Sequence, residues 1–277
     1  MKVLIVENAD LVAQMGAEII RELVDSKPKA VLGLATGSTP IAMYAYLVQI
    51  HKLRGLSFKE VSGFNLDEYI GLESDSPQSY RSFMNRSLFD GIDIGLNNTY
   101  LPSCGYEDDF NSVASEFENT IRAKGGIDLQ ILGIGRNGHI GFNEPISSLS
   151  SRTRVKTLRQ DTIEDNRRFF DEGEFQPFQA MTMGIGTILE AEHILLMATG
   201  LEKAKAVRDA IEGPLSAMCP ASALQLHKKV TVILDEASAQ ELENKNYFKW
   251  VNDKNKELEA MVSTGHTRGN SCMSEQL

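Results

Sequence analysis

Residues suited to acid–base chemistry and to phosphate binding follow three short apolar runs of the sequence. The run Ala30–Ala35 precedes the loop Thr36–Pro40 (TGSTP), a second run ends at Leu66 just before two carboxylates, and the run Leu129–Ile134 precedes a glycine-rich loop. In a parallel sheet the carboxyl ends of the strands share one edge, where ligands bind. If the three runs are strands of one sheet, we expect the three loops to form one site.

The loop after the first run has the composition of a phosphate cradle. Gly37 allows close approach of the backbone to an anion, and Thr36, Ser38 and Thr39 add hydroxyl donors. Pro40 suits the first position of a helix and Thr39 suits its cap. The loop lacks the GK[ST] ending of a Walker motif. A capped helix start that binds nothing is the alternative.

Two adjacent carboxylates, Asp67 and Glu68, follow the second run. A carboxylate at this place could act as a general base. It could equally cap a helix or be solvated. The pair alone leaves these interpretations open.

The third loop carries a spacing that resembles a dinucleotide-binding fingerprint. Gly133, Gly135 and Gly138 fit G-x-G-x-x-G, and Asp161 lies further along the chain. That fingerprint requires a helix to begin at the turn, whereas Pro145 interrupts any helix here. We therefore expect no nicotinamide or flavin cofactor.

The same loop presents His139 and, five residues later, Glu144. A histidine titrates near neutrality, and a carboxylate can orient it or pass on a proton. A purely structural histidine is the alternative. The other histidines show no metal-binding spacing, and no G-x-S-x-G motif marks a serine nucleophile, so we expect neither a metal nor a serine hydrolase.

The composition narrows the class of protein. The 277 residues include 28 Lys and Arg against 38 Asp and Glu, which gives a net charge of −10. This acidity argues against a nucleic-acid partner. No apolar run approaches the roughly 20 residues of a membrane helix, and the N-terminus does not resemble a secretion signal. Three widely spaced cysteines exclude a disulfide framework, so we expect a cytoplasmic protein with a small-molecule ligand.

The apolar runs predict strands that alternate with helices. The expected strands are Val3–Val6, Ala30–Ala35, Val61–Leu66, Leu129–Ile134, Met181–Ile185, His193–Ala198 and Val230–Leu234. Helical patterns lie between most of them, including one capped by Asp10, one over Phe110–Arg122 and one over Glu202–Ile211. This order predicts an α/β fold with a mostly parallel central sheet covered on both faces.

Two segments fall outside this alternation. Residues 147–179 are polar, rich in arginine and weakly periodic, and we expect a lid-like excursion beside the site. The chain after Asn246 predicts a charged helix, and Thr264–Leu277 is expected to be frayed. We therefore expect one domain over residues 1–250, followed by a helix and tail over 251–277.

Over residues 1–245 the chain resembles the glucosamine-6-phosphate deaminase family of sugar-phosphate isomerases and deaminases. The resemblance rests on motifs that occur in a fixed order. They are GLATGSTP (Gly33–Pro40), FNLDEYIGL (Phe64–Leu72), SYRSFM (Ser79–Met84), GHIGFNEP (Gly138–Pro145), SSLSSRTRVKTL (Ser147–Leu158), RFFD (Arg168–Asp171), GLEKA (Gly200–Ala204) and SALQLH (Ser222–His227). The family implies a Rossmann-like three-layer fold and conversion of glucosamine 6-phosphate and water to fructose 6-phosphate and ammonia, without a cofactor.

The resemblance also implies roles for individual residues. Asp67 would move the C2 proton to C1, and His139 would open the pyranose ring with Glu144 as its charged partner. Many members carry Asp where this chain has Asn137, and others carry Asn. Because an amide can hold the histidine tautomer but supplies no charge, we expect Glu144 to be the main charge partner.

Two phosphate sites follow from the same resemblance. The substrate phosphate would lie against Thr36–Thr39 (including Gly37 and Ser38), Arg168 and Lys203. In hexameric, allosterically activated members, a second site between subunits binds N-acetylglucosamine 6-phosphate. Its counterparts here are Ser147, Arg154, Lys156 and Thr157, although the tyrosine expected near that pocket does not align cleanly with Tyr247. A solvated basic stretch is the alternative. Single-chain and hexameric members both exist, and we expect a homo-oligomer.

Other functions on this scaffold remain open at this point. A 6-phosphogluconolactonase or a ketose–aldose isomerase would be another enzyme on the same scaffold, but a lactonase would not need a carbon base such as Asp67. A sugar-phosphate-sensing domain of a transcription regulator would carry a helix-turn-helix segment before the first strand at Val3.

Overall fold

The computed structural model describes residues 1–73, 75–167, 170 and 173–269, with no side chains described after residue 262. Its centre is a seven-stranded sheet in which every strand pair is parallel, in the order β1-β10-β9-β6-β2-β3-β5. The strands are β1 Lys2–Val6, β2 Val31–Leu34, β3 Ser62–Asn65, β5 Thr99–Tyr100, β6 Leu129–Leu132, β9 His193–Ala198 and β10 Val230–Asp235. The predicted parallel α/β sheet is confirmed.

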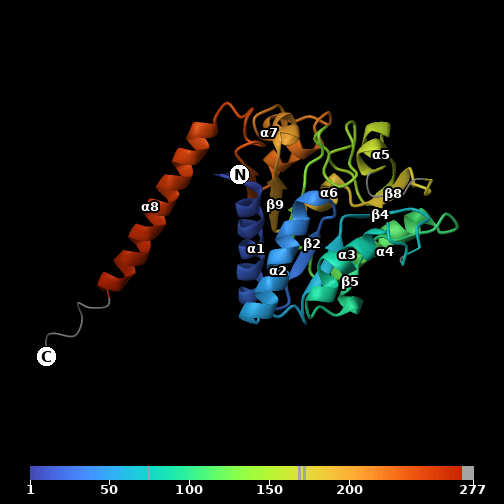
Figure 1. The fold of residues 1–277 in the computed structure, drawn as a ribbon, viewed down its shortest axis with the longest axis horizontal. Helices are drawn as coiled ribbons and strands as arrows, with labels where there is room; N and C mark the ends of the chain where they lie inside the picture. Colours follow the sequence, from blue (N-terminus) through green and yellow to red (C-terminus); the bar gives the residue numbers. More distant parts are fainter. Residues whose placement is uncertain (74, 168–169, 171–172, 270–277) are drawn as a thin grey trace.

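Helices flank the large sheet (Figure 1). They are α1 Ala9–Ser26, α2 Ser38–Arg54, α3 Tyr80–Ser87, α4 Phe110–Ala123, α5 Gln160–Asn166, α6 Ile185–Leu189, α7 Ala204–Ile211 and α8 Lys245–Gly269, with short 3-10 turns at Phe89–Gly91, Leu96–Asn98, Leu201–Lys203 and Pro220–Leu226. The inner strands are buried along their whole length, which explains their unbroken apolar sequences. In the described part of the chain, no helix has the length and apolarity needed to span a membrane.

A second, three-stranded antiparallel sheet lies beside the first (Figure 1). Its strands, in spatial order, are β4 Asp67–Tyr69, β8 Gln179–Thr182 and β7 Arg154–Thr157. The strand expected at Met181–Ile185 is therefore shifted, lies in this sheet, and gives way to helix α6 at Ile185. The sequence pattern does not predict β4 and β7, because these strands are three or four residues long, mostly polar, and contain no apolar run. The expected lid-like excursion supplies β7 and α5.

Two expected helix caps differ in the structure. Asn8, rather than Asp10, caps α1, and its Oδ1 accepts the Leu11 N–H at 3.0 Å. Helix α2 begins at Ser38 after Gly37, so Thr39 already lies inside its first turn. Gly37 has φ 107°, a conformation that L side chains rarely adopt, and the glycine is required there for its backbone.

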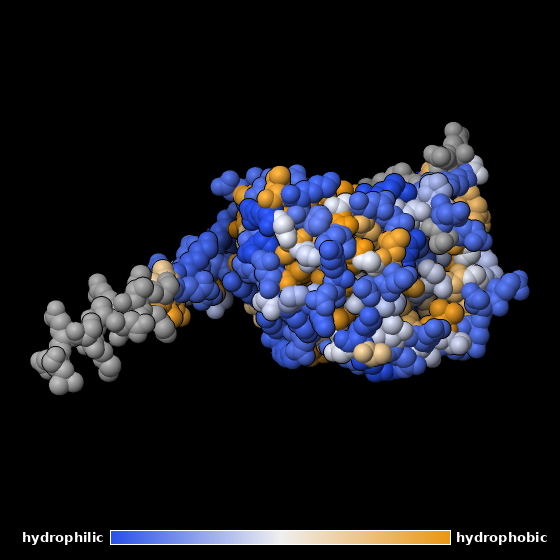
Figure 2. Space-filling view, turned by 90° about the horizontal axis from the view of Figure 1, so that it is seen from below, coloured by the Kyte–Doolittle hydropathy of each residue, from blue (hydrophilic) through white to orange (hydrophobic). Residues whose placement is uncertain are grey.

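The last helix differs in extent from the expected one. Helix α8 starts at Lys245, crosses the boundary expected at residue 250, and continues past Thr264 to Gly269. Its first turns contact β1, and the rest projects away from the body of the molecule (Figures 1 and 2). Residues 270–277 of the expected tail lie outside the described residues.

Candidate active site

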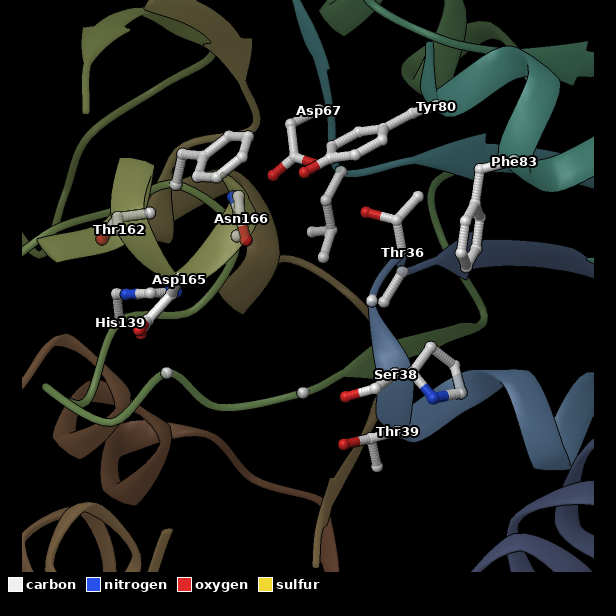
Figure 3. A pocket seen from close by; sticks show the side chains of 18 of the residues that line it. Thr36, Ser38, Thr39, Asp67, Tyr80, Phe83, His139, Thr162, Asp165 and Asn166 are labelled. Atoms are coloured by element: carbon white, nitrogen blue, oxygen red, sulfur yellow. The ribbon is translucent and has the colours of Figure 1, made fainter. Parts of the chain in front are cut away.

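One cavity of about 560 Å³ opens at the carboxyl ends of β2, β3 and β6. The loops after these three strands line it. Thr36–Thr39, Asp67 and His139 are among the lining residues, whereas Asn137 and Glu144 are not and reach the cavity only through His139. Figure 3 shows Thr36, Ser38 and Thr39 on one wall, with Asp67 beside Tyr80 and His139 beside Asp165 on the others. The volume suits a small molecule the size of a sugar phosphate.

The Thr36–Pro40 loop brings the N-terminus of α2 to the cavity. Backbone N–H groups at a helix N-terminus are donors for an anion, and the helix dipole favours negative charge there. Lys203 also lines the cavity and adds a cation. Arg168, the third expected phosphate contact, lies outside the described residues.

Asp67 begins β4 and is only 5% exposed. Burial, together with the charge of Glu68, raises its pKa to about 7, although hydrogen bonds from Thr182 and the Phe142 backbone oppose the shift. A carboxylate with a pKa near neutrality is a stronger base than an ordinary one and still ionises at physiological pH. Asp67 therefore has the properties of a general base facing the cavity.

The neighbouring carboxylate has a structural task. Glu68 is 2% exposed, and its oxygens accept the N–H groups of Tyr69, Tyr80 and Arg81 at 2.9–3.0 Å. Because Tyr80 and Arg81 begin α3, Glu68 acts as a cap from outside the helix. It does not line the cavity. Of the two adjacent carboxylates, only Asp67 belongs to the site.

His139, Asn137 and Glu144 form one hydrogen-bonded cluster. Asn137 Oδ1 lies 2.8 Å from His139 Nδ1, and Asn137 Nδ2 donates to Glu144 Oε2 at 2.9 Å. Glu144 Oε2 is itself 3.6 Å from His139 Nδ1. Asn137 Oδ1 can only accept, so Nδ1 carries the proton and the second ring nitrogen, Nε2, is left for chemistry.

The carboxylate of this cluster is ionised. Although burial opposes it, hydrogen bonds and charge interaction with His139, with Thr162 and Asn137 adding further bonds, lower the pKa of Glu144 to about 2. The hydroxyl of Thr162 donates to Glu144 Oε1. Because Thr162 belongs to α5, the excursion at residues 147–179 packs directly against the cluster.

Several further residues line the cavity, and no motif in the sequence marks them individually as site residues. Tyr69, Tyr80, Thr162, Asp165, Asn166 and Phe170 all line the cavity. Tyr69 Oη accepts a hydrogen bond from Asn166 Nδ2 at 3.1 Å, which ties β4 to the excursion. The motifs containing Tyr69 and Tyr80 were the available signal, but nothing in their spacing shows that the rings turn toward the site.

The four residues of the expected second site lie away from the cavity. Arg154, Lys156 and Thr157 are on β7, and none of the four lines the cavity. Arg154 Nη1 donates to Asn143 Oδ1 at 2.9 Å, while the buried Ser147 Oγ has no hydrogen-bond partner among the described residues. No group of three His, Cys, Asp or Glu side chains within the described ranges is arranged to hold a metal ion.

Comparison with known proteins gives a consistent result. Residues 6–233 match the family model for glucosamine-6-phosphate isomerases and 6-phosphogluconolactonase. A glucosamine-6-phosphate deaminase from Shewanella woodyi is 53% identical over 263 residues, covering 95% of this chain and 99% of the relative. One from Hahella chejuensis is 57% identical, covering 91% and 95%.

Solved structures agree with the sequence comparison. A protein described as a monomeric glucosamine-6-phosphate deaminase is 44% identical, with a TM-score of 0.84, and the match covers 87% of this chain and 100% of that one. A 6-phosphogluconolactonase from Trypanosoma cruzi has a TM-score of 0.70 at 20% identity, covers 87% of this chain and 97% of that one, and so shares the fold. The chain belongs to the family of glucosamine-6-phosphate isomerases and 6-phosphogluconolactonase.

Proposed function

We propose that this protein is a glucosamine-6-phosphate deaminase, which converts D-glucosamine 6-phosphate and water to D-fructose 6-phosphate and ammonia. The observation that carries the proposal is the cavity that brings together a phosphate cradle, a carboxylate with a raised pKa and His139, which is backed by the carboxylate of Glu144. The high identity to deaminases over nearly the full chain supports the same activity. It is an isomerising deaminase and a hydrolase acting on a C–N bond.

The first step opens the pyranose ring. His139 Nε2 exchanges a proton with the ring oxygen and the C1 hydroxyl, which releases the C1 aldehyde. Asn137 bonds to His139 Nδ1, the ring nitrogen that does not react, and Glu144 lies close to it. The charge of Glu144 stabilises the His139 imidazolium when it forms.

The second step moves a proton between neighbouring carbons. The C1 carbonyl acidifies the C2 proton, Asp67 removes it to give an enolamine, and returns it to C1. This leaves an imine at C2. Water adds to the imine carbon, and ammonia leaves to give the ketose. The substrate supplies its own electron sink, which is why the reaction as written needs no cofactor.

Lys203 and the Thr36–Thr39 loop would anchor the phosphate, which makes Lys203→Ala a test of remote binding. We expect this variant to raise KM for glucosamine 6-phosphate by about 10- to 100-fold, since a charge-assisted hydrogen bond is lost. A smaller fall in kcat is expected because the anchor also orients the reacting carbons. Lys205→Ala is the control: Lys205 is exposed, pairs with Asp209 and does not line the cavity. Equal KM values for the two variants would contradict the phosphate role.

The deciding experiment couples detection of ammonia and fructose 6-phosphate formed from glucosamine 6-phosphate. We expect both products in equal amounts. A lactonase would instead hydrolyse 6-phosphogluconolactone and release no ammonia, and a simple isomerase would release none either. A sugar-phosphate sensor would bind the substrate without turnover.

A second, activating site for N-acetylglucosamine 6-phosphate is part of the proposal. Arg154 and Lys156 supply cations on the edge strand β7, and Ser147 supplies a hydroxyl without a partner among the described residues. Arg154 also reaches Asn143, in the loop between His139 and Glu144, so an anion held there would act on the catalytic loop. Repeating the assay with the N-acetylated sugar phosphate added tests this part.

We further propose that the protein is a homo-oligomer in the cytoplasm, with residues 1–250 forming the sugar-phosphate domain. Helix α8 docks on β1 through Phe248 and through Asn252, whose Nδ2 donates to the Val3 carbonyl. Its other face carries Tyr247, Trp250 and Leu258, each 58–60% exposed. An apolar stripe at helical spacing that faces away from its own body is typical of an association surface.

Trp250→Glu tests the association surface. We expect wild type to sediment as an oligomer, and the variant to dissociate because a charge in an apolar contact is costly. Lys256→Glu, an exposed change on the opposite face of α8, is the control and should leave the mass unchanged. A wild-type protein that sediments as a monomer would contradict the proposal, and so would a Trp250→Glu oligomer.

A further inference from the structure

The small sheet aligns three polar residues in one row across its strands. Thr182 of β8 is the direct cross-strand partner of Asp67 on β4 and of Arg154 on β7. Directly opposed residues of antiparallel strands project to the same face of a sheet. The candidate base, a hydroxyl and a guanidinium therefore stand side by side, although Thr182 itself does not line the cavity.

The hydroxyl of Thr182 is fully buried and is held from several directions. Its Oγ1 accepts the Phe142 N–H at 3.1 Å and lies 3.4 Å from Asp67 Oδ2. The Phe142 N–H occupies one lone pair of the Thr182 hydroxyl. The hydroxyl proton of Thr182 therefore points toward an acceptor. The acceptors in reach are Asp67 Oδ2 and, at 3.5 Å, the Met183 carbonyl.

The backbone at Gly141 packs against the same carboxylate oxygen, Asp67 Oδ2. Gly141 has φ 54°, and a Cβ placed there would lie 3.2 Å from Thr182 Oγ1 and 3.3 Å from Asp67 Oδ2. Thr182 and Gly141 thus cover Oδ2 together. The other oxygen, Oδ1, is the one left for a substrate in the cavity that Asp67 lines.

Asn143, in the loop that carries His139, connects that loop to the strands on which Thr182 and Arg154 lie. Its Nδ2 donates to the carbonyls of Ile140 and Met183 at 2.8–2.9 Å, and its Oδ1 accepts from Arg154. The loop that carries His139 and the row that carries Asp67 therefore share one buried polar connection. The Thr182 hydroxyl is therefore enclosed by the loop and by the row, and has little freedom to rotate away from Asp67.

We propose that Thr182 is a positioning residue for the reaction. It anchors Asp67 Oδ2 so that Oδ1 faces the C2 and C1 carbons, and it favours the ionised carboxylate by donating to it. The inference rests on the proposed deaminase function, because it assigns Asp67 the proton transfer.

Thr182→Val, which keeps the shape of the side chain but removes the hydroxyl, tests the proposal. We expect kcat for ammonia release to fall by roughly tenfold or more, with little change in KM, because one buried hydrogen bond to a charged group is lost. The acid limb of the pH–rate profile should move to higher pH, because the carboxylate loses a donor that stabilises its charged form. Thr182→Ser should restore both.

A second readout reports on the geometry of proton transfer. When the reaction runs in deuterated water, we expect Thr182→Val to retain less of the original C2 proton at C1 of the product than wild type does. A loosened carboxylate exchanges its proton with solvent before returning it. A role in stability alone would leave this fraction unchanged.

Thr187→Val is the matched control. Thr187 is another buried threonine whose hydroxyl donates to a carboxylate, that of Glu118, but it does not line the cavity. We expect it to lower thermal stability as Thr182→Val does, while leaving the acid limb and proton retention at wild-type values. If Thr182→Val behaves like Thr187→Val, the inference is wrong. If wild type releases no ammonia, the proposed function itself is wrong.

Discussion

Replacing Asp67 by Asn should lower kcat for ammonia release from glucosamine 6-phosphate by about a thousandfold, within the range seen for general bases. The amide has nearly the same shape but cannot take a proton from C2. Since Asp67 is not among the groups expected to hold the phosphate, KM should change little. Initial rates of ammonia and fructose 6-phosphate formation measure both quantities.

The raised pKa of Asp67 sets the pH dependence of this activity. The base must be ionised to act, and its pKa is raised to about 7 by burial and by the charge of Glu68. We therefore expect kcat/KM of wild type to fall tenfold per pH unit below about pH 7. The residual activity of Asp67→Asn should lack this limb.

The ionisation of Asp67 should also affect stability: as pH rises, activity should increase while the folded protein becomes less stable. The folded-state pKa is above the ordinary value of 3.8, so the folded protein binds the extra proton and stability is lost as pH rises from about 4 to 7. Asn at this position is neutral at every pH. Asp67→Asn should therefore melt at a higher temperature than wild type at pH 8, and the difference should shrink toward pH 4.

Glu68→Gln is the control for the pH dependence of activity and for the pH dependence of stability. It removes an adjacent buried carboxylate that does not line the cavity, and with it the charge that raises the pKa of Asp67. We expect activity to survive and the acid limb to move to lower pH. An Asp67→Asn variant with a tenth or more of wild-type activity would show that another group takes the C2 proton.

The sequence predicts the large sheet well because its strands are buried on both faces. Apolar runs such as Ala30–Ala35 and Leu129–Ile134 carry that burial in their composition, and six of the seven expected strands lie in this sheet. The edge strand Thr99–Tyr100 is two residues long and has no such signal. Loops that follow buried strands can therefore be assigned to one edge, so the sequence alone predicts that Asp67 and His139 lie at the same site.

The small sheet could not be predicted in this way. Its strands β4 and β7 are short and polar, and their pairing partner β8 lies far along the chain. Whether Asp67 or Glu68 faces the cavity depends on which neighbour a three-residue strand pairs with, since alternate side chains point to opposite faces. Only the three-dimensional structure shows that Asp67 shares a row with Thr182 while Glu68 caps α3.

The histidine cluster supports a second prediction of large effect. Glu144→Gln should lower kcat/KM for glucosamine 6-phosphate by about a hundredfold, because the imidazolium of His139 loses the carboxylate that lies 3.6 Å from its Nδ1. The pKa of Glu144 is lowered to about 2, so its charge is present throughout the assay range and adds no limb to the profile. Its stabilising contribution is present above the ordinary value of 4.5 and is lost as pH falls toward 2.

A substrate that needs no ring opening separates this role from the others. The 4,5-dideoxy analogue of glucosamine 6-phosphate lacks both hydroxyls that could close a furanose or pyranose ring, so its turnover depends on Asp67 but not on His139 acting as a ring-opening acid. We expect Glu144→Gln to process this analogue at close to the wild-type rate. An equal loss on both substrates would instead assign Glu144 to the later steps or to folding.

A substitution at Asn137 can restore the negative charge beside His139 after the carboxylate of Glu144 has been removed. Its Oδ1 already lies 2.8 Å from His139 Nδ1, so Asp at this position would place a carboxylate nearer to the ring than Glu144 is. In the double variant Glu144→Gln with Asn137→Asp, the new carboxylate faces an amide at position 144 instead of a second carboxylate. We expect at least tenfold recovery of kcat/KM over Glu144→Gln alone, because the imidazolium regains a charged partner. No recovery would mean that the position of Glu144, bonded to Thr162, matters more than its charge.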